Sequence, residues 1–498
     1  MGRRASAWIV PAAGAAALAA AAGSMLVSPI LSDEVFTLEA AGLDWAALWK
    51  HLRADVHPPL YYLAVKAWLG VFGHSPEALR AFSLAVAALA VAAAAWLLPK
   101  QAPGRSWTGW FLAADGIVLV MSFYGRMYTL LALCCVLAWL GSDRRLREGG
   151  RIWSVLAAAA VAAGLCSHHF FGLFLTALGL WLALVHGRSA LRLAPEWGTG
   201  LAVWAAVWGR AAWEQVTQRP QHLAWVQPMD LFRWLETAGA HVVFVLAILP
   251  VGLLGMALRR RGTGLQWPVE SRAAAVAALA ALALPGLISV WKPVWNPRFT
   301  IIASPFLAVA MAPLGGLSAG VWPVAAVAAG AGWLWWPGSQ TACTSREAAR
   351  QLAAVTAASD TVVFCRLTRK PVEFYWKGGA ARRQSFPAEI DAHPGYEGRQ
   401  PEEALRAEAR RLASAAPGRV FVLADTGRPA PRVLLEALKE AGFREQPPLL
   451  ECASAGKHYF HLLAVFDPPL RQTESPSGGP RARGSPRRDP VARGYARR

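Results

Sequence analysis

The stretch at residues 273–290, AAAVAALAALALPGLISV, contains no ionised side chain. A helix that crosses the hydrocarbon core of a bilayer needs about 20 such residues. Similar runs recur, and a hydropathy walk predicts eleven spans, near 8–30, 79–98, 107–122, 128–142, 152–165, 171–185, 198–208, 238–258, 273–290, 299–314 and 321–336. Only 16% of the 498 residues are charged, against about a quarter in soluble domains. The sequence therefore predicts a mainly α-helical, multi-pass membrane protein and excludes an ordinary soluble enzyme.

The charges predict an orientation. A net charge of +19 would suggest nucleic-acid binding in a soluble protein, but here the basic residues lie between the spans and in the tail, so we expect no nucleic-acid partner. If Arg3 and Arg4 hold the N-terminus in the cytoplasm, Lys and Arg are denser in the inner segments than in the outer ones, as the positive-inside rule requires. The first apolar run is longer than a secretory signal, so we expect an uncleaved anchor. An odd number of spans then places everything after about 337 outside the cell.

Three regions follow from this pattern. Residues 1–336 form a transmembrane module whose first outer loop is 31–78, and residues 337–470 form a small extracytoplasmic α/β domain. In that domain we expect strands at Thr361–Cys365, Val420–Ala424 and 459–466, and helices at 402–412 and 432–441. Residues 471–498 are a basic tail with almost no large apolar residue, which is typical of disorder.

The six cysteines form no obvious framework. Cys134 and Cys135 lie in the predicted span 128–142, and Cys166 lies at the outer boundary, just after the span 152–165. The other three, Cys343, Cys365 and Cys452, belong to the α/β domain. One disulfide can form among these three in an oxidising space, which would leave an odd thiol. No cysteine and histidine spacing indicates a zinc site, and no phosphate-binding loop is present. We predict no resident metal, although the acids of the first loop leave a divalent cation open.

The first outer loop concentrates polar residues at the membrane surface. Asp33 and Glu34 follow the first span directly, and Asp55-Val-His57-Pro-Pro comes later in the same loop. A segment at 60–72 with several aromatic residues then suits the lipid interface. Each residue alone has an ordinary interpretation, because acids cap helices and a histidine can complete a turn. Their combination in one loop favours a functional site.

These motifs resemble a known family. Asp33-Glu34 followed by Asp55-Val-His57-Pro58-Pro59 is similar to the first lumenal loop of the protein O-mannosyltransferases and of bacterial members of glycosyltransferase family 39, including enzymes like the lipid A aminoarabinose transferase. Three downstream motifs recur there in similar order: 124–128 (YGRMY), 167–172 (SHHFFG) and 296–299 (NPRF). The resemblance covers roughly 8–335, and the C-terminal domain has no counterpart in it.

The resemblance implies a GT-C fold, a polyprenyl-phosphate sugar as donor, and inverting transfer on the extracytoplasmic face to a hydroxyl of a glycan, lipid or protein. It assigns Asp33 as the general base, which accepts the proton of the attacking hydroxyl. Glu34 would bind a donor hydroxyl or orient the acceptor. The sugar and the acceptor themselves stay open.

The remaining candidates would bind substrate. Arg126 and Arg298 suit the phosphate that gains charge as it leaves, although an arginine at a span end can also simply reach the interface. His57 would hold the loop or contact the phosphate, with Asp55 orienting it. Three further residues would line the cavity, although interfacial histidines are as often structural: Tyr128, His168 and His169.

Two other functions remain open at this level. A transporter or flippase of lipid-linked substrates would place its polar groups at the bilayer midplane, whereas here most lie in outer loops and only Asp115 sits deep in a predicted span. We expect Asp115 to hydrogen-bond another span. A non-catalytic scaffold is the third alternative, because a fold does not prove activity.

Overall fold

The computed structural model describes residues 28–102, 104–218, 230–235, 237, 239–241, 267–317, 343–391, 400–453 and 460–469. The predicted spans near 8–30, 238–258 and 321–336 lie wholly or largely outside these residues. So do the domain boundaries after 336 and 470 and the basic tail.

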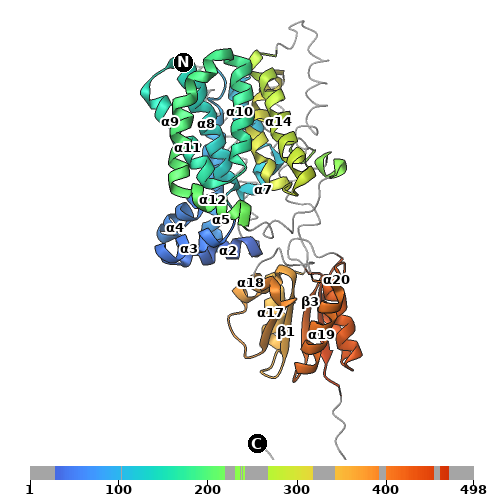
Figure 1. Cartoon of the computed structure of the whole chain (residues 1–498). Helices are drawn as coiled ribbons and strands as arrows, with labels where there is room; N and C mark the ends of the chain where they lie inside the picture. The colour runs from blue at the N-terminus through green and yellow to red at the C-terminus, as the bar shows by residue number, and fades with distance from the viewer. Residues whose placement is uncertain are drawn as a thin grey trace, which may run out of the picture.

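Apolar helices packed side by side make up the larger part of the protein (Figure 1). Their bounds are α5 Pro76–Ala94, α8 Tyr128–Glu148, α9 Arg151–Ser167, α10 Phe171–His186, α11 Ala194–Trp204, α12 Arg210–Gln218, α14 Val269–Trp291 and α15 Ser304–Met311. Among the described residues, four helical segments are long and apolar enough to cross a membrane: Pro76–Ala94, Phe171–Thr217, Val269–Trp291 and Pro297–Leu314. The count of eleven spans is therefore not confirmed.

The span predicted at 107–122 is broken, and that prediction was wrong. A 3-10 turn, η1 (Arg105–Trp107), leads into α6 (Thr108–Ala113), and a separate helix, α7 (Gly116–Ser122), follows. Asp115 stands between α6 and α7 with extended backbone, and its carboxylate accepts hydrogen bonds from the first amides of α7. An acid that caps a helix begins a new one, so the apolar run does not continue as one rod.

The first loop folds into three helices beside the bundle (Figure 1). They are α2 (Ser32–Gly42), α3 (Trp45–Ala54), which Asp44 caps by accepting from the Ala47 amide, and α4 (Leu60–Phe72). The helix α4 begins directly after Pro59, where a fixed φ suits a first turn, and it matches the predicted segment at 60–72.

The C-terminal domain is a five-stranded sheet with helices on both faces (Figure 1). The strand order is β2-β1-β3-β5-β4, in which β1 pairs in parallel with β2 and β3 while β5 is antiparallel to β3 and β4. The bounds are α17 Ser345–Val355, β1 Thr361–Cys365, α18 Arg369–Tyr375, β2 Arg382–Phe386, α19 Glu402–Ala415, β3 Val420–Ala424, α20 Pro429–Glu440, β4 Arg444–Glu451 and β5 Leu462–Asp467. The predicted strands at β1 and β3 are confirmed. Helices α19 and α20 cover one face and α17 and α18 the other.

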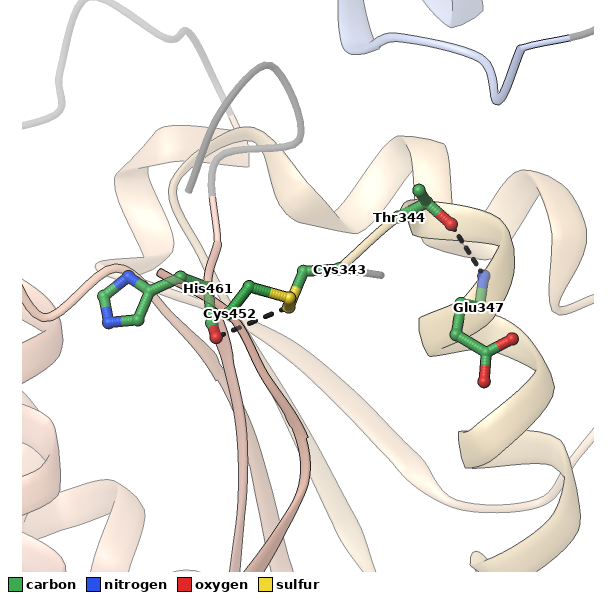
Figure 2. The surroundings of a disulfide bond; sticks show 5 residues. All are labelled: Cys343, Thr344, Glu347, Cys452 and His461. Atoms are coloured by element: carbon green, nitrogen blue, oxygen red, sulfur yellow. Dashed lines mark hydrogen bonds between the residues drawn. A yellow bond between two sulfur atoms is a disulfide. The ribbon is translucent and has the colours of Figure 1, made fainter. Parts of the chain in front are cut away.

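A disulfide joins Cys343 to Cys452 (Figure 2). It links the residue before the Thr344 cap of α17 to the residue after β4. One of the disulfides that the three cysteines allow is therefore formed, and Cys365 is the buried cysteine of this domain that lies outside it.

The C-terminal domain contacts the first loop through α18. The Tyr375 hydroxyl accepts a hydrogen bond from the Ile30 amide at 2.8 Å. Lys370 pairs with Glu39 of α2 at 2.8 Å. The Phe374 and Tyr375 rings also pack against the apolar core of the helical module. The two parts of the chain are therefore joined at α2, the helix that carries Asp33.

Candidate active site

Asp33 lies where three distant segments meet. It occupies the first turn of α2, and its Oδ2 accepts hydrogen bonds from the Tyr124 hydroxyl at 2.5 Å and from Arg298 Nη1 at 2.8 Å. Tyr124 follows α7, and Arg298 is the second residue of the 3-10 helix η5 (Pro297–Ala303). Asn296 caps η5 and also accepts from Arg298 Nε at 3.2 Å, which orients the guanidinium. The side chains of Asp33 and Arg298 are 28% and 25% exposed, so this pair is open to a ligand.

Arg126 lies behind this pair and is buried. Its Nη1 donates to the Tyr62 hydroxyl at 3.2 Å and to the backbone oxygen of Asp33 at 3.3 Å. Its Nη2 contacts His57 Nε2 at 3.0 Å, and His57 Nδ1 contacts Asp55 Oδ2 at 2.6 Å. Because a guanidinium has only donors, we assign the proton of His57 to Nδ1, which donates to Asp55. A fixed chain therefore holds Arg126 in place inside the protein, rather than at the interface.

The charges of these arginines control the acids. Burial by itself raises the pKa of Asp33, but the charges of Arg126 and Arg298 and the hydrogen bonds from Tyr124 and Arg298 outweigh it and hold the pKa well below its usual range. For Asp55, burial also raises the pKa, and the interaction with His57 brings it down to about 2. Both groups are carboxylates at neutral pH.

Glu34 occupies a different environment from its neighbour. Its side chain is 1% exposed and makes a two-pronged ion pair with Arg80, at 2.8 Å and 2.6 Å. The same carboxylate accepts the amides of Gly125 and Leu31, both at 3.0 Å. Each oxygen therefore already has two donors, which fits a residue that holds α2 against α5 better than one that meets a substrate.

An aromatic cluster extends from Asp33. The rings of Tyr124 and Tyr128 lie parallel with centroids 6.4 Å apart, and the Arg298 guanidinium lies 5.8 Å from each ring. Tyr128 also contacts the His168 ring at 5.9 Å, and Phe299 lies 5.1 Å from that ring. These rings form a surface beside the Asp33–Arg298 pair.

The two adjacent histidines are neutral at pH 7. Burial holds the pKa of His168 well below its usual value, and its Nδ1 accepts from the Phe170 amide. Burial also lowers the pKa of His169 to about 4, and its Nε2 lies 3.2 Å from Gln215 Oε1. Neither ring supplies a positive charge to a phosphate, so we expect them to shape the cavity wall.

The structure thus brings together Asp33, Arg126, Arg298, Tyr128, His57 and Asp55, and it places Glu34 and His169 in separate contacts. Sequence reasoning missed the roles of Tyr124, Arg80, Tyr62 and Asn296. The sequence carries only weak signals for two of them. Tyr124 is the first residue of the motif at 124–128, and Arg80 is a lone cation at the start of an apolar run. Within the described part of the chain, no group of three or more His, Cys, Asp or Glu residues could hold a metal ion.

Comparisons with known proteins concern the fold. No model of a known protein family matches the sequence, and no curated protein matches it. The structure of ArnT from Cupriavidus metallidurans in the apo state matches with a TM-score of 0.50 and 13% identity, over 82% of this chain and 87% of that chain. ArnT bound to undecaprenyl phosphate matches with a TM-score of 0.48 and 11% identity over the same shares. The chain therefore shares the fold of ArnT over most of its length. Together with the four apolar helical segments among the described residues, this fold indicates a multi-pass integral membrane protein.

Proposed function

We propose that this protein is an integral-membrane glycosyltransferase that moves a sugar from a polyprenyl-phosphate donor to an acceptor hydroxyl on the extracytoplasmic face. One observation carries the proposal: the partly exposed carboxylate of Asp33 pairs with the Arg298 guanidinium, and the buried Arg126 guanidinium bonds the backbone oxygen of the same residue. A lipid-linked donor brings its phosphate to this level, because its chain stays in the bilayer. The ArnT-like fold and the family motifs support the same reaction class.

In the proposed step, the acceptor oxygen forms a bond to the anomeric carbon as the bond from that carbon to the phosphate oxygen breaks. The acceptor proton passes to Asp33, and the electron pair leaves with the polyprenyl phosphate. No covalent enzyme intermediate is needed, so the configuration inverts. General bases typically contribute about 10²- to 10⁴-fold to the rate.

The resting contacts suggest how Asp33 becomes basic enough. Arg298 binds Asp33, and this contact helps to hold the pKa of Asp33 down. A phosphate can also bind a guanidinium through two parallel hydrogen bonds. When Arg298 turns to the phosphate, Asp33 loses a hydrogen bond, and its pKa rises toward its usual value as the acceptor arrives.

Arg126 would act as a fixed second cation. It is buried behind Asp33, so its positive charge would act on the developing phosphate charge through space and not through a direct hydrogen bond. His57 and Asp55 position Arg126. We assign Glu34 a positioning role in place of the predicted substrate contact, because Arg80 and two backbone amides already occupy its carboxylate.

The disulfide supports the proposed orientation. Disulfides persist in oxidising spaces outside the cytoplasm, and the Cys343–Cys452 bond belongs to the C-terminal domain. Because this domain contacts α2, the first loop lies on the same side. The positive-inside pattern independently favours a cytoplasmic N-terminus and an extracytoplasmic C-terminal domain.

The test compares Asp33→Asn with Asp44→Asn in proteoliposomes that contain a radiolabelled polyprenyl-phosphate sugar. Asp44 lies in the same loop, is exposed and caps α3, and asparagine caps equally well. We expect Asp33→Asn to lose at least 100-fold of transfer and Asp44→Asn to keep it. Full transfer by Asp33→Asn would remove Asp33 from the mechanism. Movement of the donor lipid without a new glycosidic bond would indicate a flippase, and neither activity would indicate a scaffold.

A further inference from the structure

A chain of three buried polar side chains lies apart from Asp33. Asp115, His241 and Thr300 are 2%, 0% and 0% exposed. Asp115 Oδ2 lies 2.8 Å from His241 Nδ1, and His241 Nε2 lies 2.7 Å from Thr300 Oγ1. The expectation that Asp115 bonds another segment is confirmed. Polar groups inside a membrane protein are costly, so they usually serve a function.

The hydrogen-bond geometry indicates which group donates in each of these contacts. Thr300 Oγ1 also lies 2.6 Å from the Pro297 carbonyl, and its single proton goes there because a carbonyl can only accept. The Thr300 oxygen then accepts from His241 Nε2, and Asp115 accepts from His241 Nδ1. His241 therefore bridges Asp115 and Thr300, and each of its ring nitrogens has a hydrogen-bond partner. All three groups are thereby satisfied.

Each end of this chain fixes a segment that reaches the active site. At one end, Asp115 Oδ1 accepts the Ile117 and Val118 amides and so sets the first turn of α7. Tyr124 follows the last residue of α7 by two positions. At the other end, Thr300 belongs to η5, two residues after Arg298.

Tyr124 and Arg298 are the two groups that bind Oδ2 of Asp33. We infer that Asp115, His241 and Thr300 form a positioning network, which fixes α7 relative to η5 and thereby places Tyr124 and Arg298 around Asp33 and the donor phosphate. The expected effect on the donor KM rests on the proposed function, whereas the expected effect on the structure of η5 does not.

The substitution Thr300→Val tests the network with the least change in shape. Valine replaces the hydroxyl by a methyl group, so His241 loses its acceptor in η5 while the packing volume is kept. Thr300→Ser restores the hydroxyl. Thr108→Val is the matched control: Thr108 is equally buried, and its hydroxyl bonds the Arg105 carbonyl at the start of α6.

With the full-length protein in lipid nanodiscs and a polyprenyl-phosphate sugar as donor, we expect Thr300→Val to raise the donor KM about tenfold. The acceptor KM and kcat should change less than twofold, because Asp33 itself stays in place. Thr300→Ser should return the donor KM to within twofold of the wild type, and Thr108→Val should leave it unchanged. A general loss of folded protein would lower the apparent kcat and leave KM alone.

Hydrogen exchange gives a readout that needs no activity. The amides of η5 should exchange faster in Thr300→Val than in the wild type and Thr300→Ser. If the wild type transfers no sugar but η5 loosens as expected, the proposed function fails and the positioning network stands. The inference would be overturned if Thr300→Val had the donor KM of the wild type, or if Thr300→Ser raised the donor KM as much as Thr300→Val does. Unchanged exchange of the η5 amides in Thr300→Val would overturn it as well.

Discussion

Replacing Glu34 by glutamine distinguishes a structural acid from a catalytic one. The change preserves the shape but removes the charge that faces Arg80, and both side chains are 2% exposed or less. Leaving one partner of a buried ion pair uncompensated typically costs about 3–5 kcal/mol. The glutamine NH₂ group would also face the Arg80 guanidinium or a backbone amide, because the two carboxylate oxygens now accept four donors. We therefore expect a stability loss near the upper end of this range.

The assay is a denaturant titration of purified protein in mild detergent, followed by transfer measurements on the folded fraction. Glu34→Gln should unfold at a clearly lower denaturant concentration, and the double variant Glu34→Leu with Arg80→Met should recover much of the loss, because it leaves no buried charge unpaired. Folded Glu34→Gln should keep transfer within about tenfold of the wild type. A variant with normal stability and no transfer would refute this reasoning and return Glu34 to the catalytic set.

Three further outcomes follow from the site and the C-terminal domain. Because the pKa of Asp33 is depressed, its side chain stays ionised even below about pH 3.9, the usual pKa of an aspartate, and transfer should not fall between pH 7 and about 5. Arg298→Gln should raise the pKa of Asp33 and move the acid limb of the pH profile to higher pH. His57→Phe removes the hydrogen-bond acceptor that orients Arg126. Because a hydrogen bond to a charged group contributes about 1.5–3 kcal/mol, the donor KM should rise about tenfold or more in initial-rate assays. Cys343→Ser with Cys452→Ser opens a bridge between residues 109 positions apart, and protease susceptibility in urea should show the C-terminal domain losing about 2–4 kcal/mol.

Much of the fold follows from local patterns in the sequence. The apolar run at 273–290 became α14, and the segment at 60–72 became α4 with the predicted bounds. The buried strands β1 and β3 are continuous apolar runs, which is typical of central parallel strands. The edge strand β4 was missed because REQPPLLE is exposed and contains two prolines, so no alternation marks it. The break at Asp115 was missed because hydropathy averages over a single capping acid.

The site was less accessible to sequence reasoning. The likeness to a family selected Asp33, Arg126 and Arg298, but the distances that join them span 93 and 265 positions in the chain. Such contacts arise from helix packing, which local spacing does not encode. Asp33 and Glu34 are adjacent and look equivalent in the sequence. Successive side chains of a helix point in different directions, so Asp33 reaches Arg298 while Glu34 reaches Arg80. Only the fold distinguishes the two acids.

The contact between Tyr375 and Ile30 also bears on how the protein is made. The ribosome delivers Ile30 early and Tyr375 more than three hundred residues later. The turn that precedes Asp33 therefore lacks this partner until at least 375 of the 498 residues have been made. A chain truncated before Tyr375 would therefore lack a contact that helps to hold the first loop in place.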